Sequence, residues 1–265
     1  MKFVKAHACG NDFLIVEEDC EIDQAIALCR RHTGIGADGV EVLEKTGERA
    51  GRIRLINADG SIAEISGNGT RCVAAWMAHT SHAAAGDLIH LETDAGPRNC
   101  RVVAANSPHF QMASAMGIPT MRHAMVMLPQ GLAVEGYVVN TGNPHFVLFA
   151  DDDDFEVHGL DWRSVGKAIC FHPDFPAQTN VEFVRVLATN TIAIRIFERG
   201  VGPTTSSGTG TCASAVASIA SGRAASPLTV IAEGGEQSVA WSGEGSEITL
   251  TGPAEIICTG EAFLG

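Results

Sequence analysis

The feature that most constrains how this chain folds is a motif that occurs twice. Ser66-Gly67-Asn68-Gly69-Thr70 returns as Ser207-Gly208-Thr209-Gly210-Thr211, at an offset of 141 residues. In both places a stretch rich in alanine and other small residues follows. A repeat this long exceeds the unit of a solenoid, so it predicts two similar halves rather than an array.

Further landmarks repeat in the same order along the chain. The offset of 141 also relates Val40-Glu41 to Val181-Glu182, and an offset of 132 relates Gly10-Asn11 to Gly142-Asn143. Several separate landmarks at nearly constant spacing indicate a duplicated fold rather than a chance match.

The boundary between the halves is expected near Met116, where the pattern restarts. We therefore expect one half over residues 1–117 and the other over residues 118–253. A C-terminal strand at residues 254–265 is expected to return to the first half.

Short runs rich in β-branched and aromatic residues dominate the chain, and turn-forming residues bound them, as is typical of strands. The runs expected to be strands are Phe13–Glu17, Val40–Leu43, Ile53–Ile56, Tyr137–Asn140, Phe146–Phe149, Val181–Val186, Thr191–Phe197 and Ile248–Thr251. Apolar or small residues at helical spacing predict helices at Asp23–Arg31, Cys72–His79 and Cys212–Ser221. The predicted fold class is α/β, with two similar domains facing each other across a cleft.

Each Ser-Gly-x-Gly turn lies just ahead of an expected helix. Glycine lets the backbone approach a ligand closely, and the first N–H groups of a helix, aided by its dipole, bind anions. One such turn is typical of a tight strand-to-helix connection, whereas two at matched positions imply two helix N-termini directed at one ligand. Such a pair suits proton abstraction next to a carboxylate, because negative charge grows on the held oxygens.

The composition narrows the choice of partners. Lys and Arg number 18 and Asp and Glu number 31, which gives a net charge of −13, and an acidic chain repels nucleic-acid phosphates. No window approaches the ~18 consecutive apolar residues of a membrane span, and the N-terminal stretch lacks the apolar core of a signal peptide. We expect a cytoplasmic protein that acts on a small molecule, without nucleic-acid or membrane partners.

Cysteine and histidine spacing predicts no metal site. The eight cysteines form no C-x-x-C pair, so we expect reduced thiols that lie mostly in the core. His79 and His82 have the spacing of a metal-binding pair but are better interpreted as an exposed helix end. The glycine-rich stretch Gly34–Gly39 lacks both a clear leading strand and the acidic residue about twenty positions on, so it predicts no dinucleotide site.

Seven ordered motifs resemble those of the diaminopimelate epimerase family over essentially the whole chain. They are His7–Phe13, Gly34–Gly39, Asn57–Ser61, Ser66–Cys72, Gly142–His145, Phe175-Pro176 with Thr179–Phe183, and Glu198–Gly202 with Ser207–Gly210. The resemblance implies two pseudo-symmetric domains, each a mixed sheet or partial barrel around a central helix. It also implies an isomerase that interconverts LL- and meso-diaminopimelate in lysine and peptidoglycan biosynthesis, using two thiols and no cofactor. Members of the family commonly form homodimers.

The resemblance further implies which residues hold the substrate. Those that match the family's grip on the distal, non-reacting end are Asn57, Asn180 and Arg199. Those that match the groups around the reacting amino acid are Asn11, Asn143 and Glu198. In the family, backbone N–H groups at the starts of two helices bind the reacting carboxylate. The residues that match them here are Gly67, Asn68, Gly208 and Thr209. The distal grip favours diaminopimelate over a proline-type substrate, which has no distal amino acid.

Both positions where the family has its catalytic cysteines are serine here, Ser66 and Ser207. A thiol has a pKa of about 8.5 and a water-like hydroxyl about 16, so an alkoxide at pH 7 costs roughly 12 kcal/mol. Cys72 and Cys212 lie six and five residues further on, inside the expected helices, and do not replace the missing thiols. Pro203 also stands where the family usually has glutamate.

Three functions stay open from the sequence. The first is an epimerase that carries serines, whether these are natural or were introduced in place of cysteines. The second is a catalytically silent amino-acid-binding relative, and the third is a proton-transfer double-bond isomerase on the same scaffold. The intact set of substrate-holding residues favours the first.

Overall fold

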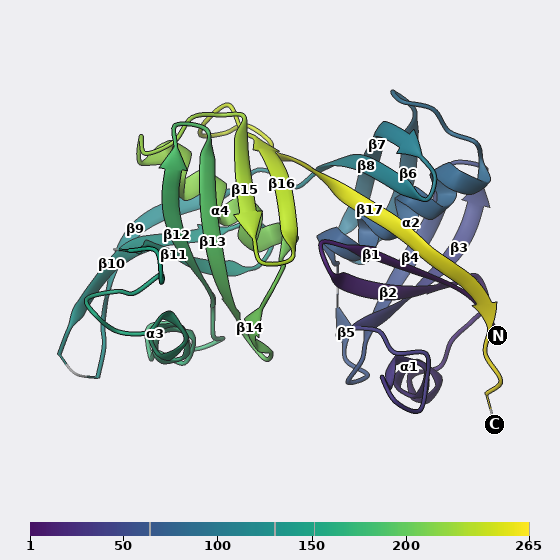
Figure 1. The fold of residues 1–265 in the computed structure, drawn as a ribbon, viewed down its shortest axis with the longest axis horizontal. Helices are drawn as coiled ribbons and strands as arrows, with labels where there is room; N and C mark the ends of the chain where they lie inside the picture. The colour runs from purple at the N-terminus through teal and green to yellow at the C-terminus, as the bar shows by residue number, and fades with distance from the viewer. Residues whose placement is uncertain (64, 130, 151, 265) are drawn as a thin grey trace. The chain divides into compact units, whose positions relative to one another are not determined.

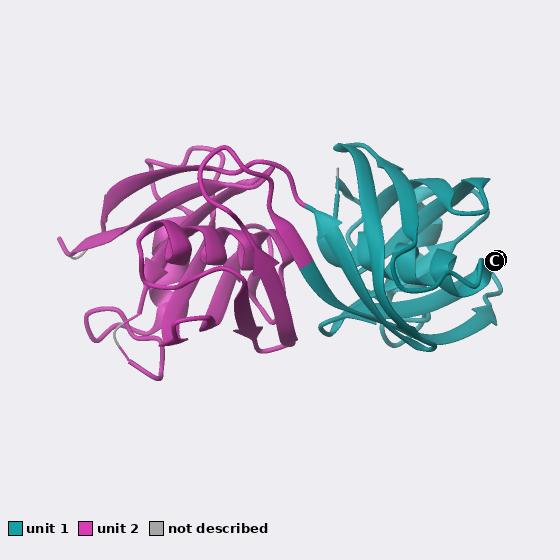
Figure 2. Cartoon of the chain, turned by 90° about the horizontal axis from the view of Figure 1, so that it is seen from above, with its two compact units in different colours: residues 1–115, 251–265 teal, residues 116–250 magenta. Residues whose placement is uncertain are grey.

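The computed structural model describes all residues except 64, 130, 151 and 265. The chain divides into two compact units, which Figure 2 shows in separate colours. Unit 1 comprises residues 1–115 and 251–265, and unit 2 comprises residues 116–250. Each unit has its own hydrophobic core around its own central helix.

Unit 1 is a closed barrel of eight strands. The strands are β1 (Lys2–Ala8), β2 (Asn11–Val16), β3 (Gly39–Gly47), β4 (Ala50–Asn57), β6 (Leu88–Thr93), β7 (Gly96–Asn106), β8 (His109–Ala115) and β17 (Thr249–Glu261). They pair in that order, and β17 closes the ring by pairing with both β8 and β1. The β2–β3 and β4–β6 pairs are parallel, so the sheet is mixed. The remaining elements are the short strand β5 (Ile62–Ala63) and the helices α1 (Ile22–Cys29) and α2 (Gly67–Thr80).

Unit 2 repeats this order of pairing. Its strands are β9 (Thr120–Met127), β10 (Ala133–Asn140), β11 (Pro144–Phe149), β12 (Asn180–Ala188), β13 (Thr191–Glu198), β14 (Gly202–Thr204), β15 (Leu228–Ala232) and β16 (Gly235–Ala240). The β11–β12 and β13–β15 pairs are parallel, and β14 lies beside β13 as β5 lies beside β4. The helices are α3 (Trp162–Cys170) and α4 (Gly208–Ala220).

Strand register confirms the duplication. In unit 1, Val40 of β3 pairs with Ile56 of β4. In unit 2, Val181 of β12 pairs with Phe197 of β13, so both partners move by the same offset as the repeated motif. The prediction of two pseudo-symmetric α/β halves, each a mixed sheet around a central helix, is therefore confirmed.

The central helices are small-residue helices because they fill the inside of a curved sheet. Cys72, Ala74 and Ala75 of α2 lie in one cluster with apolar residues from strands on every side of the barrel. Figure 1 shows helix α2 running among these strands. Helix α4 occupies the equivalent place in unit 2. Small side chains let the helix backbone approach the sheet at the packing density of a protein interior.

A second helix covers the outside of each sheet. Leu14 and Val16 of β2 face α1, whereas Phe13 and Ile15 face α2. Strand β2 is thus buried on both faces, which explains its continuous apolar run. Helix α3 packs on the outer face of unit 2 in the same manner.

The sequence prediction was incomplete in two respects. It missed α3, whose interior Gly166 weakens the helical signal, although Asp161 caps its N-terminus by accepting from two backbone N–H groups. It also missed nine strands, of which β5 and β14 are only two and three residues long, β15 has β-branched residues, and most of the others carry many polar, charged or alanine residues; they are β1, β5, β6, β7, β8, β9, β14, β15 and β16. These segments are held in the sheet by cross-strand pairing and by the burial of one face. Both depend on residues distant in the sequence, so the strand propensity of the segment itself does not predict them.

Candidate functional site

The two serines of the repeated motif are helix N-caps. Ser66 Oγ accepts a hydrogen bond from the backbone N–H of Gly69 at 3.1 Å. Ser207 Oγ accepts one from Gly210 at 3.2 Å. Both residues have the extended backbone that an N-cap adopts. Each hydroxyl therefore lies at the positive end of a helix dipole, where a developing oxyanion is stabilised.

The helices begin earlier than the sequence predicted. The prediction placed each Ser-Gly-x-Gly turn ahead of its helix, but α2 starts at Gly67 and α4 at Gly208. The glycines form the first turn itself, because the serine cap and the packing of the helix outweigh their poor helix propensity. The N–H groups of residues 67–68 and 208–209 therefore belong to the first helical turn, where backbone donors have no intrahelical acceptor.

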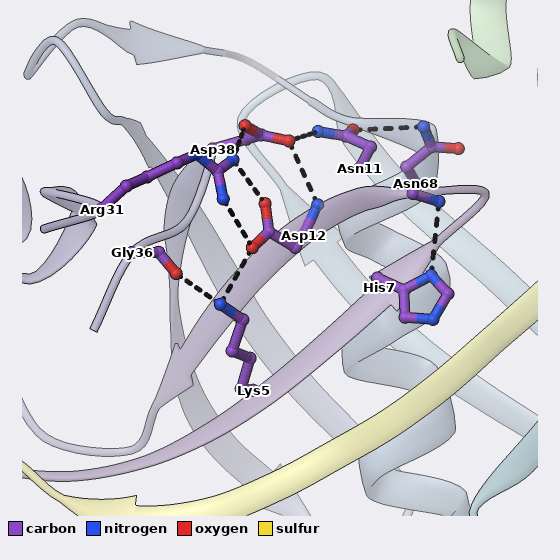
Figure 3. Close-up of polar contacts among 9 residues, drawn as sticks. Lys5, His7, Asn11, Asp12, Arg31, Gly36, Asp38 and Asn68 are labelled. Atoms are coloured by element: carbon purple, nitrogen blue, oxygen red, sulfur yellow. Dashed lines mark hydrogen bonds and ion pairs between the residues drawn. The ribbon is translucent and has the colours of Figure 1, made fainter. Parts of the chain in front are cut away.

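A polar network in unit 1 holds the first predicted asparagine (Figure 3). Asn11 Nδ2 donates to Asp38 Oδ2 at 2.7 Å, and Asn11 Oδ1 accepts from Asn68 Nδ2 at 3.1 Å. Asn68 lies at the start of α2, and its Oδ1 accepts from the buried Arg71 at 2.6 Å. The network fixes both amides and places a cation beside the N-terminus of α2.

Ion pairs between two cations and two carboxylates hold Asp38, the residue that Asn11 contacts, in place. Arg31 donates to Asp12 at 2.8 and 3.2 Å and to Asp38 at 2.5 Å. Lys5 Nζ lies 3.0 Å from Asp12 and donates to the carbonyl of Gly36 at 2.6 Å. Burial tends to raise the pKa of Asp12, but the hydrogen bonds from Arg31 and Lys5 outweigh it and hold that pKa below its ordinary value.

The equivalent asparagine of unit 2 is held by a buried histidine. His145 Nε2 lies 2.8 Å from Asn143 Oδ1, and His145 Nδ1 lies 2.7 Å from Glu182 Oε1. The side chains of His145 and Glu182 are both fully buried. A carboxyl bonded to one ring nitrogen fixes the orientation of the ring and of whatever the other nitrogen contacts.

Residues predicted to grip the distal end of the substrate divide between the units. Asn180 and Arg199 come together in unit 2, where Asn180 Oδ1 accepts from the backbone N–H of Arg199 at 3.0 Å. Arg199 Nη1 also donates to the carbonyl of Ala177 at 3.3 Å. Glu198 ends β13 next to Arg199. Asn57 belongs to unit 1, where its Nδ2 donates to Ser61 Oγ at 3.0 Å.

The predicted site residues thus form two groups, one at each motif. Those in unit 1 are Asn11, Asn57, Ser66, Gly67 and Asn68. Those in unit 2 are Asn143, Asn180, Glu198, Arg199, Ser207, Gly208 and Thr209. Within each unit, the asparagine of the Gly-Asn turn is held by neighbouring polar side chains.

A buried carboxyl lies beneath each motif helix, and sequence reasoning assigned it no role. Glu41 and Glu182 are 1% and 0% exposed and lie on the inner faces of β3 and β12. A side chain at Gly69 would collide with Glu41 Oε1, and one at Gly210 would come within 2.7 Å of Glu182 Oε1. A side chain at the third residue after either serine would therefore require the buried carboxyl beneath it to shift.

The two carboxyls differ in their partners. Glu182 bonds His145, whereas the carboxyl oxygens of Glu41 contact no hydrogen-bond donor among the described residues. Burial raises the pKa of Glu41 to about 8. The repeated Val-Glu landmark was the signal in the sequence that could have identified this pair.

The cysteines nearest the serines are core residues. Cys72 and Cys212 are fully buried in α2 and α4, and burial raises the pKa of the Cys72 thiol well above its ordinary value. This placement agrees with the prediction that they do not replace the missing thiols. None of the described cysteines forms a disulfide, and all but Cys258 are buried.

The described part of the chain shows neither a helix that could cross a membrane nor a metal-binding cluster. No helix there is long and apolar enough to cross a membrane. No group of three or more His, Cys, Asp or Glu side chains there has an arrangement suited to a metal ion. His79, one of the two histidines considered above, instead contacts Ser107 Oγ at 3.1 Å.

Comparison with known families gives one consistent match. The family model described as diaminopimelate epimerase matches residues 3–121 and 137–257. A diaminopimelate epimerase from Heliobacterium modesticaldum is 36% identical over 98% of this chain and 99% of its own length. Both matches extend over the two units.

Solved structures with low sequence identity share the fold. A predicted epimerase from Pseudomonas aeruginosa superposes with a TM-score of 0.77 at 13% identity, over 100% of this chain and 99% of that one. A hydroxyproline epimerase from Agrobacterium vitis, bound to trans-4-hydroxy-L-proline, gives a TM-score of 0.68 at 17% identity, over 98% and 90% of the two chains. At these identities the likeness concerns the fold alone.

Proposed function

The chain belongs to the diaminopimelate epimerase family, and we propose that it is an amino-acid epimerase that interconverts LL- and meso-2,6-diaminopimelate without a cofactor. Enzymes of this family are isomerases. The main support is the pair of equivalent helix N-termini, each capped by a serine at a position where the family has a catalytic cysteine.

Ser66 and Ser207 are the proposed proton-transfer groups. One takes the proton from Cα, and the other delivers a proton to the opposite face of the same carbon. The electron pair left on Cα spreads onto the substrate carboxylate, which the N–H groups at the starts of α2 and α4 stabilise. Charge and atoms balance, because one proton leaves and one arrives.

The serines set the expected rate. Forming an alkoxide at pH 7 costs roughly 12 kcal/mol before any help from the surroundings. The positive end of a helix contributes at most ~2 kcal/mol. Each hydroxyl accepts a backbone N–H, which favours the oxyanion but does not remove the proton. We therefore expect slow turnover with intact substrate binding.

The proposed substrate contacts follow the two groups of residues. Asn11, Asn143 and Glu198 would surround the reacting amino acid, and Asn57, Asn180 and Arg199 the distal one. The hydrogen bond from the Arg199 backbone to Asn180 supports a joint role for this pair. A guanidinium presents a planar fork that suits the distal carboxylate.

Solvent exchange at Cα tests the proposal. Diaminopimelate is incubated with the protein in deuterium oxide, and deuterium at Cα is followed by mass spectrometry while binding is measured by calorimetry. Exchange, even if slow, supports the epimerase. Tight binding with no exchange above the buffer rate indicates the catalytically silent relative, and no binding indicates another substrate, as for a double-bond isomerase.

The proposal extends to location and assembly. The enzyme would act in the cytoplasm on a soluble amino acid and, as is common in the family, as a homodimer. Light scattering on the purified chain tests the assembly, since a mass near the 27.8 kDa of one chain contradicts a dimer.

A further inference from the structure

The His145–Glu182 pair lies on the inner face of unit 2, directly behind a predicted substrate residue. Val147 and Val184 occupy the same face two residues further along β11 and β12 and pack in the core around α4. His145 and Glu182 therefore point inward, under the helix that Ser207 caps. Two polar side chains in such a place need partners, because burying an unpaired polar group is costly.

The contacts of His145 define where its protons lie. Asn143 Oδ1 can only accept, so the 2.8 Å contact with His145 Nε2 requires a proton on Nε2. The other ring nitrogen, Nδ1, lies 2.7 Å from Glu182 Oε1, within hydrogen-bond distance. With its oxygen facing the ring, the Asn143 amide directs its N–H groups away from His145.

In unit 1 the equivalent side chain, Asn11, is held by a contact to its amide nitrogen instead of its oxygen. Phe13 and Glu41 occupy the places of His145 and Glu182, and a phenyl ring cannot donate a hydrogen bond. Asn11 is held instead by Asp38, which accepts from its amide nitrogen at 2.7 Å. The Asn11 oxygen accepts from Asn68 at 3.1 Å and keeps a second lone pair.

The position of Asp38 has no carboxylate in unit 2. At an offset of 141 stands Thr179, whose hydroxyl donates to the carbonyl of Asn180 at 3.0 Å. Among the described residues, the hydrogen bond that orients the Asn143 side chain is the one with His145. The duplicated fold thus holds its two equivalent asparagines in opposite senses.

We propose that Glu182 and His145 are positioning residues that hold Asn143 as a hydrogen-bond donor to the carboxylate of the reacting amino acid. This inference rests on the proposed function. Because the oxygen of the Asn143 amide faces the ring, the side of the amide left for a ligand carries N–H groups, which a carboxylate accepts.

Histidine ring spectroscopy tests the proton assignment without substrate. In the long-range proton–nitrogen spectrum of the ¹⁵N-labelled chain, His145 is identified by the loss of its signals in His145→Gln. We expect Nε2 in its protonated range at neutral pH. An unprotonated Nε2 would mean that the Asn143 amide faces the ring with its nitrogen, and the proposed polarity would be overturned.

Substrate affinity tests the positioning role with a matched pair of variants. His145→Phe copies the arrangement that unit 1 already accommodates at Phe13 and removes the donor, whereas His145→Gln retains a donor for Asn143. By calorimetry we expect His145→Phe to weaken diaminopimelate binding about tenfold, as for one lost hydrogen bond. His145→Gln should stay within about threefold of the unsubstituted chain.

The outcomes separate this inference from the proposed function. Equal affinity of the phenylalanine variant and the unsubstituted chain, or equal losses in both variants, would overturn the positioning role. If the unsubstituted chain binds no diaminopimelate, the proposed function fails, and the ring spectrum still decides how His145 holds Asn143.

Discussion

Replacing Glu41 with glutamine should stabilise unit 1 above pH 8 and change its pH dependence between pH 4.5 and 8. The Glu41 side chain is 1% exposed, and its oxygens contact no donor among the described residues. Glutamine has nearly the same shape and is neutral at every pH. The comparison therefore isolates the cost of keeping an ionisable group in this place.

The magnitude follows from linkage. Burial raises the pKa of Glu41 from 4.5 to about 8 in the folded state. Below pH 4.5 both folded and unfolded chains carry the proton, so the group does not alter stability. Between the two values the unfolded chain loses the proton while the folded chain keeps it, and stability falls as pH rises. At 1.36 kcal/mol per pKa unit, the loss reaches about 5 kcal/mol at pH 8 and is constant above.

Urea unfolding at a series of pH values from 4.5 to 9 measures this difference. Trp76 lies on α2 in unit 1, and replacing Trp162 and Trp241 with phenylalanine leaves it as the only tryptophan of the chain. The Glu41→Gln curve should diverge from the reference by several kcal/mol as pH rises. Glu182→Gln is the matched control in unit 2 and should leave the Trp76 transition unchanged. A difference between Glu41→Gln and the reference that is the same at every pH would refute the reasoning.

Three further predictions address the motif and its ligands. Ser66→Cys combined with Ser207→Cys should raise turnover by orders of magnitude, and either change alone by much less, because inversion needs both an acid and a base; a Ser/Ser chain as fast as the double variant would contradict this. Arg199→Ala should weaken diaminopimelate binding by about 2–5 kcal/mol, with little rescue by lysine; unchanged affinity in calorimetry would mark it as a surface charge. Gly69→Ala should destabilise the chain by about 1–3 kcal/mol in thermal unfolding, because its methyl group meets the carboxyl beneath α2. Gly47→Ala, with no atom nearer than 3.5 Å, is its control, and a stabilised Gly69→Ala would show that helix propensity decides instead.

Much of the fold was predictable because duplication makes each half evidence for the other. One Ser-Gly-x-Gly turn is ambiguous, but two at the same offset as Val40 and Val181 predicted two equivalent halves, and the equivalent strand pairs of the two units differ by that same offset. The sequence predicted that a C-terminal strand returns to the first half, but it did not predict that this strand closes a barrel. The closure depends on the pairing of β1 with β17, which lie at opposite ends of the chain, and no local pattern encodes the partner of a strand at that separation.

The candidate site was predictable as a set of residues but not as a set of contacts. Asn11 and Asn143 stand in equivalent Gly-Asn turns, which continue as Asp12-Phe13 in one half and as Pro144-His145 in the other. Their difference comes from Asp38 in one unit and His145 in the other, which the folded strands bring alongside. Which end of an amide side chain faces its neighbour depends on contacts formed in the folded chain, so the orientation of Asn11 and Asn143 is known only from the three-dimensional arrangement.

The closing strand also determines the order in which the units can be completed during synthesis. Residues 116–250 form unit 2 as one continuous segment, whereas unit 1 needs residues 251–265 in addition to residues 1–115. Until β17 emerges from the ribosome, β1 and β8 are open edges with unpaired backbone groups, and such edges invite pairing with other chains. The half of the protein that is translated first is therefore the half that finishes folding last, and the nascent chain is most exposed to aggregation during that interval.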